Sequence, residues 1–292
     1  MTDTTGAEVP RDIEVALERL RIRARRIELV SPLGERKGVR IAYRVDTDDG
    51  RTVKLRHFGS ASTAEAHLAL RAGIDDDFAP ASTSCGPVLF EAWIEGNELI
   101  AHEADRRAAE AGALLGRLHA RPLAAGCGPV RGDTARWRAA AQSDLAILHR
   151  AGSLSSAEVA GLEAQLARRD PGSARTSLIH KDFCAENMVV DGSGRLRVID
   201  NEQLEIGPSG FDLGRTFHRW PMSAGAWVRF LGGYRSTAPE VPEAIAFWKI
   251  AATLVGARVF LERMPERLDA ALALLRRFVA GVDLEDVTGA EP

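Results

Sequence analysis

The sequence predicts an α+β fold of two lobes, a small antiparallel sheet followed by a mostly helical region. Two observations support this prediction. Short apolar runs separated by turn residues fill residues 27–96, which is the pattern of strands. Longer segments with apolar residues three and four positions apart dominate 103–279, which is the pattern of amphipathic helices. The pattern changes near Gly96, and both parts lie in the ordinary size range of domains.

The strand-rich part is preceded by residues 1–26, which are expected to form a tail and a packing helix with apolar residues at helical spacing. A meander of three strands follows, separated by turn residues: 27–30, 39–45 and 52–58. Ser62 is expected to open a helix that ends at Gly73, and further strand-like runs reach 85–94. We therefore assign 27–96 to the small lobe.

Residues 97–292 form the predicted helical lobe. Helical spacing predicts these segments as helices: 108–118, 135–148, 155–167, 224–234, 242–261 and 265–279. The apolar runs 177–179 and 188–190 interrupt them and predict a hairpin with a polar loop.

Composition excludes several classes of protein. The 292 residues carry a net charge of -3, which gives no nucleic-acid footprint. No apolar run approaches the roughly 18 residues of a membrane-spanning helix, and the N-terminus lacks a secretory pattern. Three cysteines without a C-x-x-C pair indicate free thiols. We expect a cytoplasmic protein that is a monomer or weak homodimer, without membrane or nucleic-acid partners.

The polar loop and the strand after it carry the chemistry. Asp182, Asn187 and Asp200 stand at strand ends in a His-x-Asp-x-x-x-x-Asn pattern that is followed by an apolar strand and an acid. An Asp can accept a proton from an attacking hydroxyl, while an Asn carbonyl and a second Asp can hold Mg²⁺ beside a nucleotide. The alternative is a turn built by Asp and Asn. Asn occurs only three times in the chain, so its position in register favours phosphoryl transfer from ATP or GTP.

The small lobe should supply a cation for the phosphates. Lys54 lies in a predicted strand of a chain that uses Lys only four times, and its compact ammonium suits a diphosphate better than a guanidinium does. An exposed strand face is the alternative explanation. Gly34 and Gly38 lie between two predicted strands, where their amides can approach phosphate oxygens or merely form a turn.

Supporting roles are predicted for further side chains. Glu65 can anchor Lys54 from the helix, or it can complete a capping box with Ser62. His180 is interpreted as a hydrogen-bonding residue that holds the loop, and Cys184 as a loop-packing residue. Asp212 can be a helix N-cap.

The segments IHKDFCAENMVV, RLRVIDNEQLEIG and GFDLGR together resemble the aminoglycoside phosphotransferase and choline kinase superfamily, whose members are protein-kinase-like small-molecule kinases. The resemblance extends to Lys54, Glu65 and FEAWIEG, over about residues 27–280. It implies a protein-kinase-like fold and the following roles: Asp182 as catalytic base, Asn187 and Asp200 as Mg²⁺ ligands, Lys54 on the ATP phosphates, the backbone of Glu91, Ala92 and Trp93 on adenine, and Asp212 supporting the loop.

Two residues depart from that family's pattern. Lys181 and Glu186 stand where Gly is common, which leaves the loop conformation and its charge open. Asn201 and Glu202 follow the acid, and no Ala-Pro-Glu segment comes later, which counts against a protein kinase.

A small hydroxylated substrate is therefore expected, such as an aminoglycoside-like antibiotic, an amino sugar or a nucleoside. A cationic substrate would require acids, for which Glu202 and Glu205 are candidates, although arginines nearly balance the charge of that region. The alternatives are a nucleotide-binding regulatory pseudokinase, a protein-kinase-like regulator, and a helical interaction protein without activity.

Overall fold

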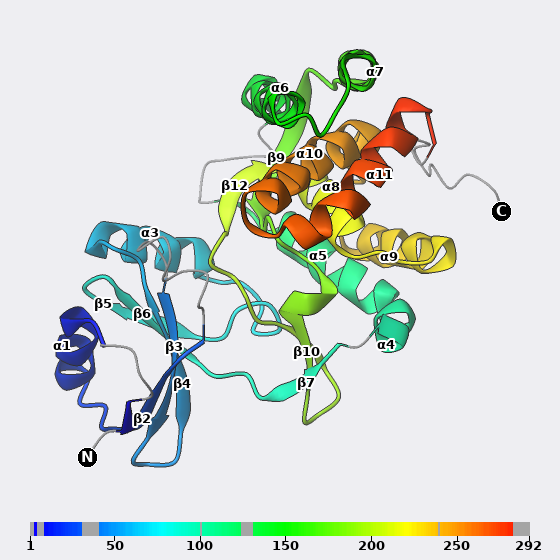
Figure 1. Ribbon diagram of the computed structural model, residues 1–292. Helices are drawn as coiled ribbons and strands as arrows, with labels where there is room; N and C mark the ends of the chain where they lie inside the picture. The colour runs from blue at the N-terminus through cyan, green and yellow to red at the C-terminus, as the bar shows by residue number, and fades with distance from the viewer. Residues whose placement is uncertain are drawn as a thin grey trace. The chain divides into compact units, whose positions relative to one another are not determined.

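The structure is a computed structural model, shown as a ribbon in Figure 1. It describes residues 3–4, 9–30, 41–99, 101–123, 131–238 and 240–282. The chain divides into two compact units, Met1–Glu98 with Met188–Leu204, and Leu99–Asn187 with Glu205–Pro292. The strand-rich unit thus includes a late segment that the sequence division had placed in the helical lobe.

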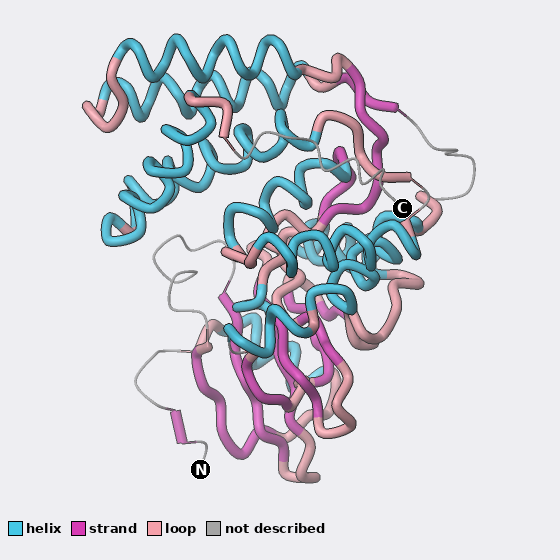
Figure 2. The backbone as a smooth tube through the Cα atoms, turned by 90° about the vertical axis from the view of Figure 1, so that its right-hand side faces the viewer, coloured by secondary structure: helices cyan, strands magenta, loops and turns pink. Residues whose placement is uncertain are grey.

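The first unit is built on a six-stranded sheet, whose strands run side by side in Figure 2. Neighbours are antiparallel apart from the first pair. The strand order is β1-β2-β3-β4-β6-β5, with these bounds: β1 Asp3–Thr4, β2 Ala24–Leu29, β3 Ile41–Thr47, β4 Thr52–His57, β5 Ser82–Cys85 and β6 Val88–Ala92.

Helix α1, Arg11–Arg19, packs on this sheet as the sequence predicts. Ile13, Ala16 and Leu17 are buried because spacings of three and four put them on one face. They join a core cluster with strand residues such as Val45 and Leu55, both fully buried. Burial of each such Leu or Ile side chain contributes roughly 1.5–3 kcal/mol.

Helix α3, Ala61–Arg71, differs in its start from the prediction. Its N-cap is Ser60, whose Oγ accepts a hydrogen bond from the Thr63 amide at 3.2 Å, so the capping box expected from Ser62 and Glu65 is wrong. The buried face carries Ala64, His67 and Arg71. Glu65 is consequently exposed.

The strands on either side of the polar loop do not form the predicted hairpin. β10, Met188–Asp191, pairs with β11, Leu196–Val198, and with β7, Gly96–Glu98. β9, Ser173–Ile179, instead pairs with two other strands, β8, Arg131–Asp133, and β12, Glu205–Pro208. Spacing identifies both strands, but it does not show that β9 and β10 join different sheets.

The second unit is mostly helical and is centred on α10, which is buried around most of its circumference. α10 packs against α6, α7, α8 and α11. The helices have these bounds: α4 Ala101–Arg106, α5 Ala108–Ala120, α6 Ala135–Arg150, α7 Ser156–Arg169, α8 Ser209–Arg219, α9 Ala224–Thr237, α10 Ile245–Arg263 and α11 Leu268–Val279, with short 3₁₀ turns at η1 Ala185–Asn187 and η2 Pro265–Arg267. None of the helices in the described ranges is long and apolar enough to cross a membrane.

Helices α5 and α9 approach each other closely through glycines. A Cβ added at Gly233 would lie 1.9 Å from the carbonyl oxygen of Ala109, whereas a Cβ at the neighbouring Gly232 would meet nothing within 4 Å. Two adjacent glycines of one helix therefore have different roles.

We predict that Gly233→Ala lowers the free energy of unfolding by about 2 kcal/mol or more, because the added methyl group forces α5 and α9 apart. The matched Gly232→Ala change should raise it by up to about 1 kcal/mol through helix propensity. Urea unfolding of both variants measures the two values, and equal effects would contradict the packing described here.

Candidate active site

Lys54 lies in β4 directly opposite Glu91 of β6. Its ammonium nitrogen is 3.8 Å from Glu91 Oε1 and 3.7 Å from Asp200 Oδ1, and it donates a hydrogen bond to the Ile199 carbonyl at 3.0 Å. Among the residues that the structure describes, the acidic partners of Lys54 thus come from the sheet and from the segment after β11. The expected Lys54–Glu65 pair is absent because Glu65 faces away on α3.

Glu91 is the centre of a buried charge cluster that the sequence did not reveal. The Glu91 side chain is 3% exposed. Its carboxylate also forms ion pairs with Arg71 of α3 and with Arg56, whose guanidinium lies 3.8 Å away. Burial alone would raise the pKa of Glu91, but Arg71, Arg56 and Lys54 outweigh it and hold that pKa below its usual value. Helix α3 therefore presents a cation to the cluster, and the strand provides the acid.

Arg56 connects this cluster to the predicted metal ligand. It donates to Asp200 Oδ1 at 3.2 Å and pairs with Glu202, while its own side chain is only 2% exposed. The pKa of Lys54 falls to about 8 because burial disfavours its charged form and Arg56 repels it, against attraction by Glu91 and Asp200. Lys54 is thus a cation that titrates near neutral pH.

The Lys54 side chain faces a small cavity of about 60 Å³ within the first unit. Four of its lining residues are the predicted nucleotide-binding residues Lys54, Glu91, Ala92 and Trp93. The others are Pro80, Ile94, Ile199 and Asn201. The Trp93 amide donates a hydrogen bond of 3.2 Å to the carbonyl of Thr52, the first residue of β4. Gly34 and Gly38 lie outside the described residues.

The polar loop of the second unit is held by Asp212. This carboxylate is fully buried in the first turn of α8 and accepts hydrogen bonds from the amides of His180 and Lys181, both at 2.6 Å. Nε2 of His119, in α5, lies 3.1 Å from Oδ2 of Asp212. Asp212 is therefore not the N-cap of α8, and it fixes the start of the loop instead.

Lys181 has a left-handed backbone conformation, with φ of 70°. Only glycine adopts this region without steric cost, so the Lys181 backbone is strained. The Lys181 ammonium pairs with Glu205 at 2.8 Å, and Arg136 also binds Glu205 at 2.9 Å. The side chain is thus anchored at the strand β12.

Asp182 follows with both carboxylate oxygens oriented. The Asn187 amide nitrogen donates to the Asp182 carbonyl at 2.8 Å and lies 3.3 Å from its Oδ2. Oδ1 lies 3.4 Å from guanidinium nitrogens of both Arg215 and Arg219. The 3₁₀ turn η1 brings Asn187 back to Asp182, which leaves the amide oxygen of Asn187 as a potential metal ligand.

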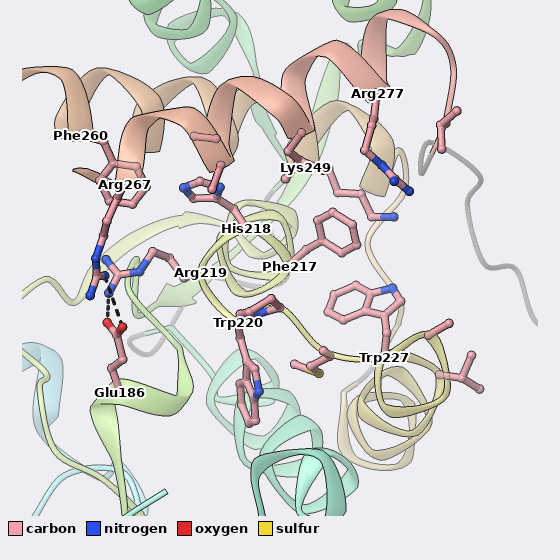
Figure 3. A pocket seen from close by; sticks show the side chains of 18 of the residues that line it. Glu186, Phe217, His218, Arg219, Trp220, Trp227, Lys249, Phe260, Arg267 and Arg277 are labelled. Carbon is pink, nitrogen blue, oxygen red and sulfur yellow. Dashed lines mark hydrogen bonds and ion pairs between the residues drawn. The ribbon is translucent and has the colours of Figure 1, made fainter. Parts of the chain in front are cut away.

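Other loop residues have structural roles. The amide of Asp182 donates to Nδ1 of the buried His180 at 3.2 Å, which agrees with a role in holding the loop. Burial and the nearby Asp182 raise the pKa of Cys184 to about 11, so this thiol stays protonated and packs. Glu186 pairs with Arg219 at 2.5 Å and Arg267 at 3.3 Å, as the dashed lines of Figure 3 show.

A large cavity of about 1270 Å³ opens beside this loop, within the second unit (Figure 3). Glu186 and Arg219 line it next to Asp182, and aromatic side chains line much of the rest: Phe217, Trp220, Trp227 and Phe260. The sequence analysis missed Arg215, Arg219 and this cavity. The two arginines could have been found from their spacing, because they follow Asp212 by three and seven residues and therefore lie on the same face of α8.

The two predicted metal ligands each carry a donor that suits magnesium. Asn187 of the second unit offers an amide oxygen and Asp200 of the first unit a carboxylate, and Mg²⁺ prefers oxygen ligands. Within the described ranges, no three His, Cys, Asp or Glu residues cluster as a metal site.

Comparisons with known proteins agree with the fold. One similar structure is a macrolide 2'-phosphotransferase type I, 16% identical over 92% of this chain and 98% of the other, with a TM-score of 0.66. Another is the choline kinase LicA from Streptococcus pneumoniae, 14% identical over 92% and 99%, with a TM-score of 0.66. A complex of LicA with AMP is 15% identical over 82% and 88%, with a TM-score of 0.57. No curated protein sequence matches significantly.

The fold is thus that of the kinase-like phosphotransferases, as the sequence predicted. A family model of the "Phosphotransferase enzyme family" matches residues 40–248, which is more than half of the chain. The match spans Lys54, the loop around Asp182, and Asp212. The chain therefore belongs to the phosphotransferase enzyme family, whose members are small-molecule kinases.

Proposed function

We propose that this protein transfers the γ-phosphoryl group of ATP to a hydroxyl of a small molecule, with Asp182 as the catalytic base. The carrying observation is the loop geometry, in which Asn187 orients the Asp182 carboxylate and Arg219 joins it to the large cavity. An acceptor in that cavity would lie beside the proposed base.

The nucleotide is proposed to bind in the first unit. Lys54 would hold the phosphates, and the cavity beside Ala92 and Trp93 would take the base. The AMP complex of a similar choline kinase supports nucleotide binding by this fold. Mg²⁺ bound by Asn187 and Asp200 would neutralise phosphate charge.

Positioning and electrostatics account for most of the catalysis in such a reaction. Asn187 contacts Oδ2 of Asp182, and Arg215 and Arg219 each lie 3.4 Å from Oδ1. The carboxylate that would orient the acceptor hydroxyl and take up its proton is therefore held at both oxygens.

The acceptor is proposed to be a bulky hydroxylated metabolite of the antibiotic type. The cavity volume and the similarity to a macrolide phosphotransferase support this size class. The acids considered for aminoglycoside amines are engaged elsewhere, since Glu202 pairs with Arg56, and Glu205 pairs with Arg136 and Lys181. A regulatory pseudokinase is the competing proposal, and it predicts ATP binding without turnover.

The first test is Asp182→Asn. Loss of the base should lower kcat about 10²- to 10⁴-fold, while ATP affinity stays within a factor of two. A coupled ADP-release assay and nucleotide titration measure both values. The control Asp48→Asn changes an exposed turn residue and should have no effect. Unchanged turnover in Asp182→Asn would remove Asp182 from the mechanism.

The second test is the pH dependence of ATP binding. Since the ammonium of Lys54 is the binding form and its pKa is about 8, ATP affinity should fall as the pH rises through 8, by at most about tenfold per pH unit. In Lys54→Arg the charge persists, so the decline above pH 8 should disappear although the reaction is slower. A flat wild-type profile between pH 7 and 10 would contradict this role of Lys54.

The third test compares two glutamates. Glu91→Gln leaves Lys54, Arg56 and Arg71 without their shared buried anion, so it should destabilise the protein by about 3–5 kcal/mol. Glu65→Gln changes an exposed side chain and should stay within about 0.5 kcal/mol. Urea unfolding measures the free energy of unfolding of both variants. A larger loss for Glu65→Gln than for Glu91→Gln would contradict Glu91 as the main partner of Lys54 and favour Glu65.

A further inference from the structure

Arg219 lies at the end of the α8 face that holds the catalytic loop, residues 180–187. Asp212 binds the start of this loop, and Thr216, one turn later in α8, donates a hydrogen bond to the carbonyl of Phe183 at 2.9 Å. Arg219 follows Thr216 by three residues and therefore lies on the same face of the helix. Its guanidinium meets the later part of the loop.

Two acids of the catalytic loop share this guanidinium. Nη2 of Arg219 donates a hydrogen bond to Oε2 of Glu186, whereas Nη1 lies 3.4 Å from Oδ1 of Asp182. That oxygen of Asp182 is buried and has no hydrogen-bond partner among the described residues. Charge-assisted hydrogen bonds between nitrogen and oxygen are about 2.7–2.9 Å long. Arg219 is therefore hydrogen-bonded to Glu186 and only close to Asp182.

A second arginine holds Glu186 from the other side. Nη1 of Arg267, in the 3₁₀ turn η2, lies 3.3 Å from Oε1 of Glu186, and the dashed lines of Figure 3 show both arginines on this carboxylate. Without the negative charge of Glu186, the two guanidinium groups would repel each other. Within the described ranges, Asp182 is the other acid that pairs with Arg219, so the guanidinium would be drawn toward it.

A close pair between Arg219 and Asp182 would hinder the proposed base. A carboxylate that takes up a proton needs a lone pair directed at the hydroxyl of the substrate. Arginine and a carboxylate often form two parallel hydrogen bonds, which would occupy both oxygens of Asp182. By engaging the guanidinium, Glu186 keeps this pair open.

Arg215 provides an internal reference for this effect. Its Nη2 also lies 3.4 Å from Oδ1 of Asp182, but Arg215 pairs with no second acid among the residues that the structure describes. It is 8% exposed, so the surrounding packing limits its movement. Loss of the Glu186 charge should therefore change the contact of Arg219 with Asp182 and leave that of Arg215 as it is.

We propose that Glu186 is a positioning residue for phosphoryl transfer, which holds Arg219 away from a hydrogen-bonded pair with Asp182 and so keeps the base available to the acceptor. Its role in catalysis rests on the proposed kinase activity. The competition of the two acids for Arg219 does not. Glu186 also lines the large cavity, so direct binding of the acceptor is the competing explanation.

The first test compares crystal structures of the wild-type protein and Glu186→Gln, both without ligands. In the variant, the shortest distance between Arg219 nitrogens and Asp182 oxygens should fall from 3.4 Å to about 2.9 Å, the length of a charge-assisted hydrogen bond. The Arg215 contact should not change. Glu186 is exposed, so the variant should fold. An unchanged Arg219 contact overturns the proposal.

Glu262→Gln is the matched control. The guanidinium of Arg258 is likewise shared by two acids, Glu262 and Asp144, and none of these three residues lines the large cavity. The control should leave both Arg219 and the turnover number unchanged. Equal effects of the control and of Glu186→Gln would also overturn the proposal.

The second test measures kinetics with an acceptor found by an ADP-release screen of hydroxylated antibiotics, amines and sugars. Glu186→Gln should lower kcat about tenfold, while KM for the acceptor stays within about twofold. Adding Arg219→Gln to this variant should raise kcat again by about fivefold or more, because no guanidinium remains to close on Asp182. Two losses of a purely structural kind would instead accumulate.

The outcomes separate the explanations. A raised KM with unchanged kcat in Glu186→Gln shows direct binding of the acceptor and overturns the proposal, as does a double variant slower than Glu186→Gln. If no compound is phosphorylated while Arg219 moves as expected in the crystal, the kinase proposal fails and the competition for Arg219 stands.

Discussion

The candidate active site depends on one buried carboxylate, that of Asp212. It lies in the first turn of α8 and binds the two backbone amides at the start of the catalytic loop, as well as His119 from α5. A fully buried anion without donors would be strongly unfavourable, so the loop and both helices must be in place together. The same helix continues to Arg215 and Arg219, which contact Asp182, and then reaches the large cavity. One element thus fixes the loop, the proposed base and one wall of the proposed acceptor site.

In the first unit, the corresponding constraint is electrostatic balance around Glu91. One buried acid is shared by cations from β4 and α3, so a change in any of them alters the charge felt by the others. Arg56 extends this network to Asp200 and Glu202. The pKa of Lys54 is lowered first by burial and then by Arg56, while Glu91 and Asp200 oppose this change, so the charge of Lys54 depends on the whole cluster.

Local patterns predicted the fold class and most helices, because apolar periodicity reports which face of an element is buried. The loop motif likewise placed Asp182 and Asn187 near each other, and the two residues are in contact because a single short turn separates them. The errors concern contacts between distant segments. Nothing near Glu65 in the sequence shows that Glu91, opposite Lys54 in the sheet, provides the acid, and nothing in the two apolar runs around the loop shows that they join different sheets. The large cavity combines residues of α8, α9, α10 and α11, so the spacing of residues along the sequence does not reveal it either.

Lys181 also bears on the order of the catalytic loop. Its left-handed backbone is strained for a residue with a side chain, but glycine at that position would give the unfolded loop many more conformations to lose. With Lys181 tied to Glu205, part of that entropy is already removed before any ligand binds. The conformation of the catalytic loop is therefore restricted before a ligand binds, and the ordering of the loop reduces the binding free energy by less.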